Sequence, residues 1–370
     1  MSFDSKESDA LHARVAEVID ANGALDEPSV HALALDIARH QHRCVAPLRK
    51  LYEARGLDPA SLSLLDDVPA VPTDVFKLRR VAAHPPEQDR RVFRTSGTTI
   101  GARGVHAFRT LSTYERAAIA WGERWLLRPR PARAILLTPP FDDASDSSLG
   151  FMIDLFVRTL ELPSETFVRG DAVDHVGLER YARDAADQGE AVIVFGTAFA
   201  YVYALDALVA RTLPLAPGSR ALLTGGFKGR TREVPEAELR RSIGALFDLP
   251  TSHVVGEYGM TELSSQLYEP RLVEAGIAAA APAVDGVYVA PPWVRVTAVD
   301  PDSLAALPTG EIGLARIFDL ANVDSSLAIQ TQDRVRVVGP GRIQLLGRAP
   351  GAPPRGCSLA IEDILSDAGA

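Results

Sequence analysis

The sequence predicts an α/β fold in which a largely parallel sheet is covered by helices and a smaller β-rich part follows. Between about residues 130 and 260, apolar strand-like segments alternate with amphipathic helical segments, which is the pattern of a parallel sheet with crossover helices. From Gly286 onward the pattern changes to short β-rich stretches separated by turns. The chain has 370 residues, 46% of them hydrophobic and 24% charged, so it is long enough for one large domain or two smaller ones.

The elements are expected in the following order. Apolar residues at helical spacing predict two or three helices over residues 9–56, and Gly56 ends that block. A helix is expected over 112–127, with Ser112 as its cap. Three buried strands, at 132–140, 189–198 and 219–226, are each followed by a helix, at 147–160, 199–211 and 235–249. A short strand at 251–259 leads into a loop, four β-rich stretches fill 287–348, and a proline- and glycine-rich turn precedes a short amphipathic end.

Composition narrows the classes of protein that the chain can belong to. The net charge is −9 and the basic residues are scattered among acidic ones, which argues against a nucleic-acid partner. Cys44 and Cys357 are the two cysteines, too few for a disulfide framework or a four-ligand metal site, so a reduced, cytoplasmic compartment is expected. Cys44 is interpreted as helix packing. No signal peptide and no membrane-spanning apolar run are expected.

The stretch "FRTSGTTIGARGVHAF", residues 93–108, is a candidate phosphate-binding loop. Backbone N–H groups in a glycine-rich turn can form a nest for an anion. The residues that would line it are Thr95, Ser96, Gly97, Thr98, Thr99, Gly101, Arg103 and Gly104. Arg103 adds a guanidinium fork suited to phosphate oxygens. The spacing is not that of the nucleotide loop G-x-x-x-x-G-K-[ST], and a solvated turn is the alternative.

A second cluster, in "VVGEYGMTELSSQLY", follows an apolar strand. Loops at the carboxyl ends of strands are where α/β proteins bind ligands. Tyr258 could stack on a base, Thr261 could donate to a phosphate, and the Glu262 carboxylate could hold Mg²⁺. The alternative is a helix cap with a surface tyrosine. The eight histidines suggest no metal site; His106 is expected to be structural, and the acidic, serine-rich stretch 142–148 is expected to cap a helix.

Five ordered motifs resemble those of the adenylate-forming enzymes, which include acyl-CoA ligases, firefly luciferase and peptide-synthetase adenylation domains. They are "TSGTTIGARG", "LTGGFKG", "EYGMTE", "IQTQDRVRV" and "LLGRAPGAPPRGCSLAIEDIL". The resemblance implies an N-terminal helical segment at 1–68, an adenylate-forming core at 69–345 and a truncated hinge with a cysteine-bearing segment at 346–370. Three departures stand out: Ile100 interrupts the phosphate loop, Gln332 replaces a glycine, and "RAPG" replaces an aspartate-containing hinge.

Within that superfamily the chain resembles the LuxE-type acyl-protein synthetases of the fatty acid reductase complex. The resemblance is carried by "VPAVPTDVFK", "DSSLGFMI", "GGFKG" and "RGCSL". Ordinary adenylate-forming enzymes continue into a mobile lobe that carries a lysine for the acyl carboxylate and α-phosphate, and that lobe is expected to be lacking here. We therefore hypothesise that Lys228 supplies this charge, or Arg103; the alternative is a solvated charged loop.

The resemblance implies that ATP and Mg²⁺ activate a carboxylic acid, expected to be fatty, as an acyl-adenylate. Cys357 would then accept the acyl group as a thioester and pass it to a partner reductase or carrier protein. The implied catalytic residues are Cys357, Lys228, Thr261 and Glu262, the last also holding the metal. The implied nucleotide-binding residues are those of the 95–103 loop together with Gly225, Gly226, Tyr258, Gly259, Asp333 and Arg348.

Two questions stay open at this point. Because a thiolate is the attacking form, Cys357 is expected to have a pKa lowered by Arg355 and to lie in a proline- and glycine-rich turn rather than in an apolar stripe. The alternative is a small buried side chain that only packs, as a free cysteine usually does. The acceptor could instead be the thiol of coenzyme A or of a carrier protein. A third alternative is a non-catalytic subunit that only binds nucleotide or acyl groups.

Overall fold

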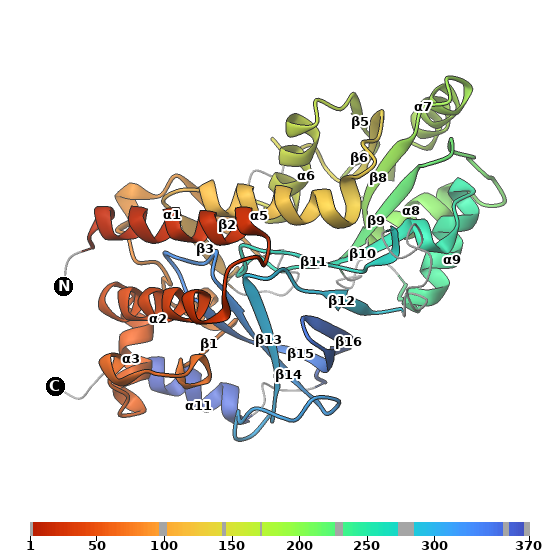
Figure 1. Ribbon diagram of the computed structural model, residues 1–370. Coiled ribbons are helices and arrows are strands. Elements are labelled where there is room, and N and C mark those ends of the chain that lie inside the picture. The colour runs from red at the N-terminus through yellow and green to blue at the C-terminus, as the bar shows by residue number, and fades with distance from the viewer. Residues whose placement is uncertain are drawn as a thin grey trace. The chain divides into compact units, whose positions relative to one another are not determined.

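The computed structural model describes residues 3–95, 102–142, 146–170, 172–225, 232–272, 285–350 and 355–365 (Figure 1). The chain divides into two compact units, each built from segments distant in sequence. The first unit contains residues 1–120, 260–266 and 289–370, and the second contains residues 121–259 and 267–288. The sequence predicted three segments, at 1–68, 69–345 and 346–370. Motifs rather than contacts set the boundaries of these segments, and the boundaries stay a prediction.

The second unit contains the predicted parallel sheet. Its strands lie in the order β12 (Val287–Val289), β11 (Leu267–Tyr268), β10 (Val254–Tyr258), β9 (Arg220–Thr224), β8 (Val192–Thr197), β4 (Arg133–Leu137) and β5 (Ser164–Thr166). The five strands from β10 to β5 are parallel, whereas β11 runs antiparallel to β10. Every residue of β8 is buried, as expected for a central strand covered on both faces.

Helices cover this sheet as the alternating pattern predicted. They are α6 (Ser148–Thr159), α7 (His175–Asp187), α8 (Ala198–Ala207) and α9 (Glu236–Phe247), with a π-helical turn at Glu123–Leu127 and a small ribbon of β6 (Val168–Arg169) and β7 (Ala172–Val173). α8 and α9 lie together against β8 and β10 (Figure 1). The Ser147 side chain accepts the Gly150 N–H at 3.1 Å, so the serine before α6 caps the helix as predicted.

The first unit contains the β-rich part. Its strands are β1 (Val71–Pro72), β2 (Arg91–Arg94), β3 (Val105–Phe108), β13 (Val294–Val299), β14 (Ile312–Asp319), β15 (Ala328–Gly339) and β16 (Arg342–Arg348). Strands β13 to β16 form an antiparallel meander, β1 adds to β15 in parallel, and β2 pairs with β3 as a separate ribbon. The tight turn at 340–341 joins β15 to β16, which suits antiparallel neighbours, whereas the longer connections at 300–311 and 320–327 join the other strands.

The helices of the first unit are α1 (Ser5–Ala21), α2 (Glu27–Cys44), α3 (Ala46–Ala54), α4 (Val75–Leu78), α5 (Ser112–Gly122) and α11 (Arg355–Leu365). α11 lies beside α3 (Figure 1). The Asp4 and Asp26 side chains cap α1 and α2. The expected Ser112 cap is wrong: Ser112 is the first helical residue, and its N–H donates to Thr110 Oγ1 at 3.3 Å.

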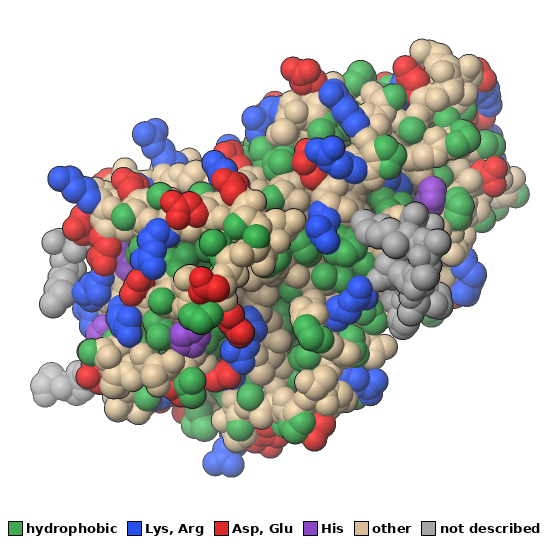
Figure 2. Space-filling view, in the orientation of Figure 1, with side chains coloured by type: hydrophobic (Ala, Val, Ile, Leu, Met, Phe, Trp, Pro, Cys, Tyr) green, Lys and Arg blue, Asp and Glu red, His purple; other side chains and the backbone are tan. Residues whose placement is uncertain are grey.

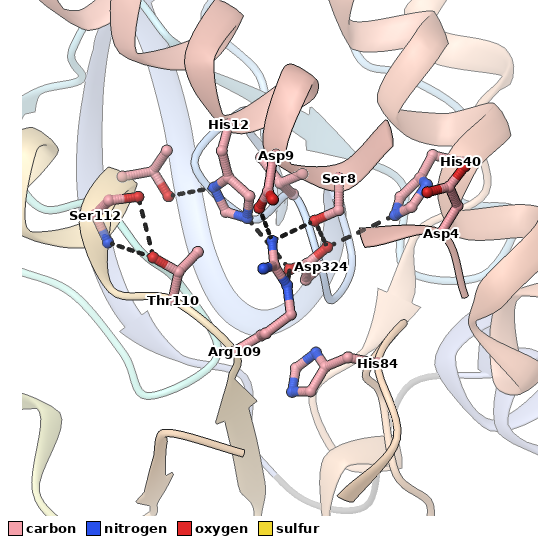
Figure 3. Close-up of polar contacts among 12 residues, drawn as sticks. Asp4, Ser8, Asp9, His12, His40, His84, Arg109, Thr110, Ser112 and Asp324 are labelled. Carbon is pink, nitrogen blue, oxygen red and sulfur yellow. Dashed lines mark hydrogen bonds and ion pairs between the residues drawn. The ribbon is translucent and has the colours of Figure 1, made fainter. Parts of the chain in front are cut away.

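A buried carboxylate joins the N-terminal helices to the loop between β14 and β15 (Figure 3). Asp324 accepts hydrogen bonds from Ser8 Oγ at 2.6 Å, His12 Nε2 at 3.2 Å and Arg109 Nε at 3.3 Å, and His40 Nε2 lies 3.6 Å away. Burial would raise the pKa of Asp324, but the hydrogen bonds from His12 and Ser8, together with the nearby His40 ring, hold it well below its usual range. The carboxylate is therefore charged and fully paired.

The surface carries side chains of both charges, as their scattering along the sequence predicted (Figure 2). Figure 2 shows acidic and basic side chains interspersed over the visible face. Within the described ranges, no helix combines the length and the apolar character needed to cross a membrane.

Candidate functional site

The stem of the predicted phosphate loop is closed by hydrogen bonds between its two sides. The Thr95 N–H donates to the Gly104 carbonyl at 3.0 Å, and the Gly104 N–H donates to Thr95 Oγ1 at 2.8 Å. Arg103 donates from Nε to the Thr95 carbonyl at 2.6 Å and from Nη2 to the Arg94 carbonyl at 3.2 Å. The Arg103 guanidinium thus links the two sides of the stem through Nε and Nη2. The tip, with Ser96, Gly97, Thr98, Thr99 and Gly101, lies outside the described residues.

Gly104 brings this stem close to Glu262. A Cβ added at Gly104 would lie 2.9 Å from Thr95 Cγ2 and 3.5 Å from Glu262 Oε1. A side chain there would therefore have to displace Thr95 and would crowd the carboxylate. Two motifs that are more than 150 residues apart in the sequence thus meet in the first unit, as the sequence predicted for one site.

The backbone of the Thr261–Glu262 pair is held by two buried side chains. His106 Nδ1 lies 2.8 Å from the Thr261 carbonyl oxygen, and Asn322 Nδ2 donates to the Glu262 carbonyl at 2.9 Å. A carbonyl oxygen only accepts, so His106 Nδ1 carries the hydrogen and Nε2 accepts from Ser325 Oγ at 2.9 Å. Burial lowers the pKa of His106 to about 4, against the opposing hydrogen bond to Thr261, so the ring is neutral at physiological pH.

The Glu262 side chain is only 5% exposed. Burial raises the pKa of its carboxyl to about 7; its own N–H and the charges of Lys77 and Arg348 act in the opposite direction, whereas Asp74 adds to the increase. Among the described residues, no group of three His, Cys, Asp or Glu side chains could hold a metal ion. A lone carboxylate fits Mg²⁺ because Mg²⁺ is usually held by one or two carboxylates, with water and substrate phosphates completing its octahedron.

Sequence reasoning missed a braced ion pair beside Glu262. Lys77 Nζ lies 2.6 Å from Asp74 Oδ1, and Gln332 Nε2 donates to Asp74 Oδ2 at 2.7 Å. The Lys77 side chain is 42% exposed. Gln332, noted above only as a departure, thus fastens α4 to β15. The aspartate and lysine three residues apart in "VPTDVFK" were the available signal.

Asp333 and Arg348 lie opposite each other across β15 and β16. A register shift follows Asp333, so the ladder is irregular where these residues stand. The Asp333 N–H donates to Thr331 Oγ1 at 3.1 Å. The structure thus brings together two of the residues that the resemblance implies for nucleotide binding.

Cys357 lies in the first turn of α11 and not in a proline- and glycine-rich turn, so that expectation is wrong. Its side chain is 1% exposed and packs with Val299 and Leu314. Burial, reinforced by the charge of Asp74, raises the pKa of the thiol to about 11, so the expected lowering by Arg355 is wrong too. A thiol surrounded by apolar side chains loses the solvation that stabilises its thiolate.

The second unit contributes the residues predicted around adenine. Tyr258 ends β10, and its ring centroid lies 6.1 Å from that of Tyr288. Gly225 follows β9 with φ of +67°, a conformation that favours glycine. The side chains of Thr224 and Glu257 are hydrogen-bonded at the carboxyl ends of these neighbouring strands. Burial raises the pKa of Glu257 to about 7, with the Thr224 hydrogen bond opposing.

The predicted site residues therefore fall into three groups. The first unit holds Thr95, Arg103, Thr261, Glu262, Asp333, Arg348 and Cys357. The second unit holds Gly225, Tyr258 and Gly259. Gly226 and Lys228 lie outside the described residues, like the loop tip. A small cavity beside His12, His106 and Asp324 has a volume of about 10 Å³, which admits a single water and no substrate.

This fold is that of the adenylate-forming ligases. 2-Hydroxyisobutyryl-CoA ligase in complex with 2-HIB-AMP and CoA superposes with a TM-score of 0.60 at 14% identity, over 87% of this chain and 72% of that one. ATP-bound MatB from Rhodopseudomonas palustris superposes with a TM-score of 0.51 at 16% identity, over 73% of this chain. The match spans about half, 49%, of the length of MatB.

Comparison with known sequences identifies the protein family to which the chain belongs. Residues 17–366 match the family model described as "Acyl-protein synthetase, LuxE", and the chain belongs to this family. It is 21% identical over 322 residues to the long-chain-fatty-acid–luciferin-component ligase of Aliivibrio fischeri, covering 82% of this chain and 80% of that protein. The enzyme of that name from Vibrio harveyi is 22% identical over 316 residues, covering 82% and 79%. The predicted fold, family and ligase class are confirmed.

Proposed function

We propose that this chain uses ATP to activate a long-chain fatty acid as an acyl-adenylate and then ligates the acyl group to a thiol. The observation that carries the proposal is the match to the acyl-protein synthetase family over residues 17–366, because this range contains every segment of the candidate site. The two curated relatives are named for ligation of long-chain fatty acids, which supports a fatty acyl substrate.

In the first step, a carboxylate oxygen of the acid attacks the α-phosphorus of ATP, and the bond to pyrophosphate breaks. The loop at Thr95–Gly104, with Arg103, would hold the β- and γ-phosphates and stabilise the charge that develops on the leaving pyrophosphate. The Thr261 hydroxyl would donate to the α-phosphate. Glu262 would hold Mg²⁺, which neutralises phosphate charge when bound.

The nucleoside end of ATP would be bound by the remaining predicted residues. Tyr258 would stack on adenine, and Asp333 would accept hydrogen bonds from the ribose hydroxyls. Arg348 would lie near the ribose or phosphate. Gly225, Gly226 and Gly259 would allow the backbone to approach the nucleotide closely. Lys228 stays a hypothesis for the charge near the α-phosphate.

In the second step, the Cys357 thiolate attacks the acyl carbonyl carbon, AMP leaves, and a thioester forms. The acyl group would then pass to an acyl-accepting protein. Support comes from the position of Cys357 within the family match. A second candidate acceptor, the thiol of coenzyme A or of a carrier protein, is favoured by the burial of Cys357 and by its pKa of about 11.

The test is to incubate the protein with ATP, Mg²⁺ and a panel of carboxylic acids, and to weigh the intact chain. We expect a gain of one acyl group that hydroxylamine removes, that Cys44→Ser retains and that Cys357→Ser abolishes. Pyrophosphate release without a gain in mass would assign the acceptor to an external thiol. Nucleotide binding without pyrophosphate release for any acid would leave a subunit that only binds and would contradict the proposal.

A further inference from the structure

The backbone of the Thr261–Glu262 pair is fixed at two successive carbonyls from two different elements. His106 on β3 donates to the first carbonyl at 2.8 Å, and Asn322, after β14, donates to the second at 2.9 Å. These carbonyls belong to the two peptide planes that flank the Glu262 Cα. Because each peptide unit is planar, holding both planes restrains the φ and ψ of Glu262 and hence the direction of its Cα–Cβ bond.

His106 is itself held from every side. It is 1% exposed, and its Nε2 accepts from Ser325 Oγ at 2.9 Å. Its ring lies 4.1 Å from the Phe108 ring and 5.7 Å, edge to face, from the Phe76 ring, measured between centroids. The hydrogen bonds to Thr261 and Ser325 set the tautomer of the His106 ring, and the contacts with Phe108 and Phe76 set the plane of the ring. A donor locked in this way can hold a backbone carbonyl without rotating away.

The position of His106 along the chain gives this contact its meaning. His106 stands two residues after Gly104, on the strand that leaves the predicted phosphate loop. Gly104 already brings the loop stem close to Glu262 Oε1. The hydrogen bond from His106 to Thr261 therefore ties the strand after the loop to the segment that carries the proposed magnesium ligand.

We propose that His106 is a positioning residue that sets Thr261 and Glu262 relative to the stem of the phosphate loop for binding Mg·ATP. This inference rests on the proposed function, because it takes Thr261 and Glu262 to be the groups that meet phosphate and Mg²⁺. It assigns a part in nucleotide binding to a histidine that the sequence suggested was only structural. The hydrogen bond to Thr261, rather than burial of the ring, is what the role requires.

Two substitutions separate the two hydrogen bonds of His106. In His106→Asn, the side-chain amide can stand where Nδ1–H stands and can still donate to the Thr261 carbonyl. In His106→Gln, the longer amide reaches the Nε2 position and the bond to Ser325, but it lacks the donor to Thr261. His84→Gln is the matched control, because His84 is equally buried in the first unit and pairs with Asp89 at 2.9 Å.

The readout is Mg·ATP affinity by titration calorimetry, together with the unfolding temperature of the free protein. We expect His106→Gln to weaken Mg·ATP binding about 10–100-fold, as for other lost outer-shell contacts, and His106→Asn to weaken it less than about threefold. His84→Gln, whose amide can keep the bond to Asp89, should leave Mg·ATP affinity unchanged. Equal affinity in the two His106 variants would overturn the inference.

Failure of the proposed function gives a different result. If the wild type binds Mg·ATP and the Asn and Gln variants differ as expected, but no acid gives pyrophosphate release, the inference stands and the ligase proposal falls. If the wild type binds no Mg·ATP, both fall together.

Discussion

At the scale of single residues, the Glu262 carboxyl is a group of the candidate site whose pKa its surroundings shift strongly. Burial raises its pKa from the ordinary 4.5 to about 7. The folded protein therefore binds this proton more tightly than the unfolded chain does. The stabilising effect is complete below pH 4.5 and is lost as the pH rises through 7. A bound cation would reverse this preference, since it favours the charged form.

Glu262→Gln tests this interpretation, because glutamine keeps the shape of the side chain and removes its titration. Without divalent cations, we expect the unfolding free energy of the wild type to fall relative to the variant by about 3 kcal/mol between pH 4.5 and pH 8. Urea unfolding at the two pH values measures the difference. In pyrophosphate release, the variant should lose about two to three orders of magnitude. A variant with full activity would remove Glu262 from the site.

Gly104 is the second residue whose replacement gives a clear outcome. Gly104→Ala places a methyl group 2.9 Å from Thr95 Cγ2, so the stem must shift. We expect a loss of about 1–3 kcal/mol in unfolding free energy, as for an overpacked site, together with weaker Mg·ATP binding. Gly56→Ala is the control, because a Cβ at Gly56 meets nothing within 4 Å although its φ is +61°. Its effect should be confined to stability; a loss of Mg·ATP affinity in Gly56→Ala as well would contradict the local interpretation.

At the scale of elements, the helix α11 decides what Cys357 can do. Gly356 donates its N–H to the Pro301 carbonyl at 3.2 Å, and a Cβ there would lie 2.7 Å from Leu304 Cγ. The helix is thus seated closely on the turn after β13, and the thiol beside it is buried. Sequence reasoning expected a turn because proline and glycine precede the cysteine. The packing partners that bury it come from strands more than 40 residues away.

Alkylation kinetics measure that burial directly. At pH 7.5 a thiol with a pKa of about 11 is ionised about 100 times less than an ordinary thiol. We therefore expect iodoacetamide to modify Cys357 at least about 100-fold more slowly in the native protein than in urea. Peptide mass spectrometry over time gives the rate, and Cys44, which is half-buried, serves as the internal comparison. Equal rates in the native and unfolded protein would show that Cys357 is open to solvent.

At the scale of the whole molecule, the sequence predicted the local helices and strands but missed the contacts between residues that are far apart in the chain. The strand and helix alternation of the second unit and the meander of the first follow hydrophobic periodicity, which each segment carries by itself. Two of the motifs also identified the segments around Gly104 and Glu262 that meet in the first unit. The contacts of Gln332 with Asp74 and of His106 with Thr261 join residues more than 150 positions apart, and neither pair forms a motif. Asp324 is the extreme case, since its partner Ser8 is 316 residues away.

Asp324 therefore supports the last prediction, that the first unit depends on one carboxylate. Asp324→Asn would leave His12, His40 and Arg109 without their shared anion, and breaking a buried ionic network in this way costs about 3–5 kcal/mol. Urea unfolding at pH 7 measures the loss, and hydrogen exchange over Ser5–Ala21 should show α1 loosened.

Because the folded pKa of Asp324 lies below its unfolded value, its stabilisation is complete above about pH 4 and is lost as the pH falls, so the variant should differ less from the wild type in acid. Asp9→Asn is the control: Asp9 also pairs with Arg109, at 2.6 Å, but its side chain is 64% exposed, and its loss should cost less than about 1 kcal/mol. Equal losses of unfolding free energy for the two variants would show that the contacts of Asp324 stabilise the first unit no more than an exposed ion pair does.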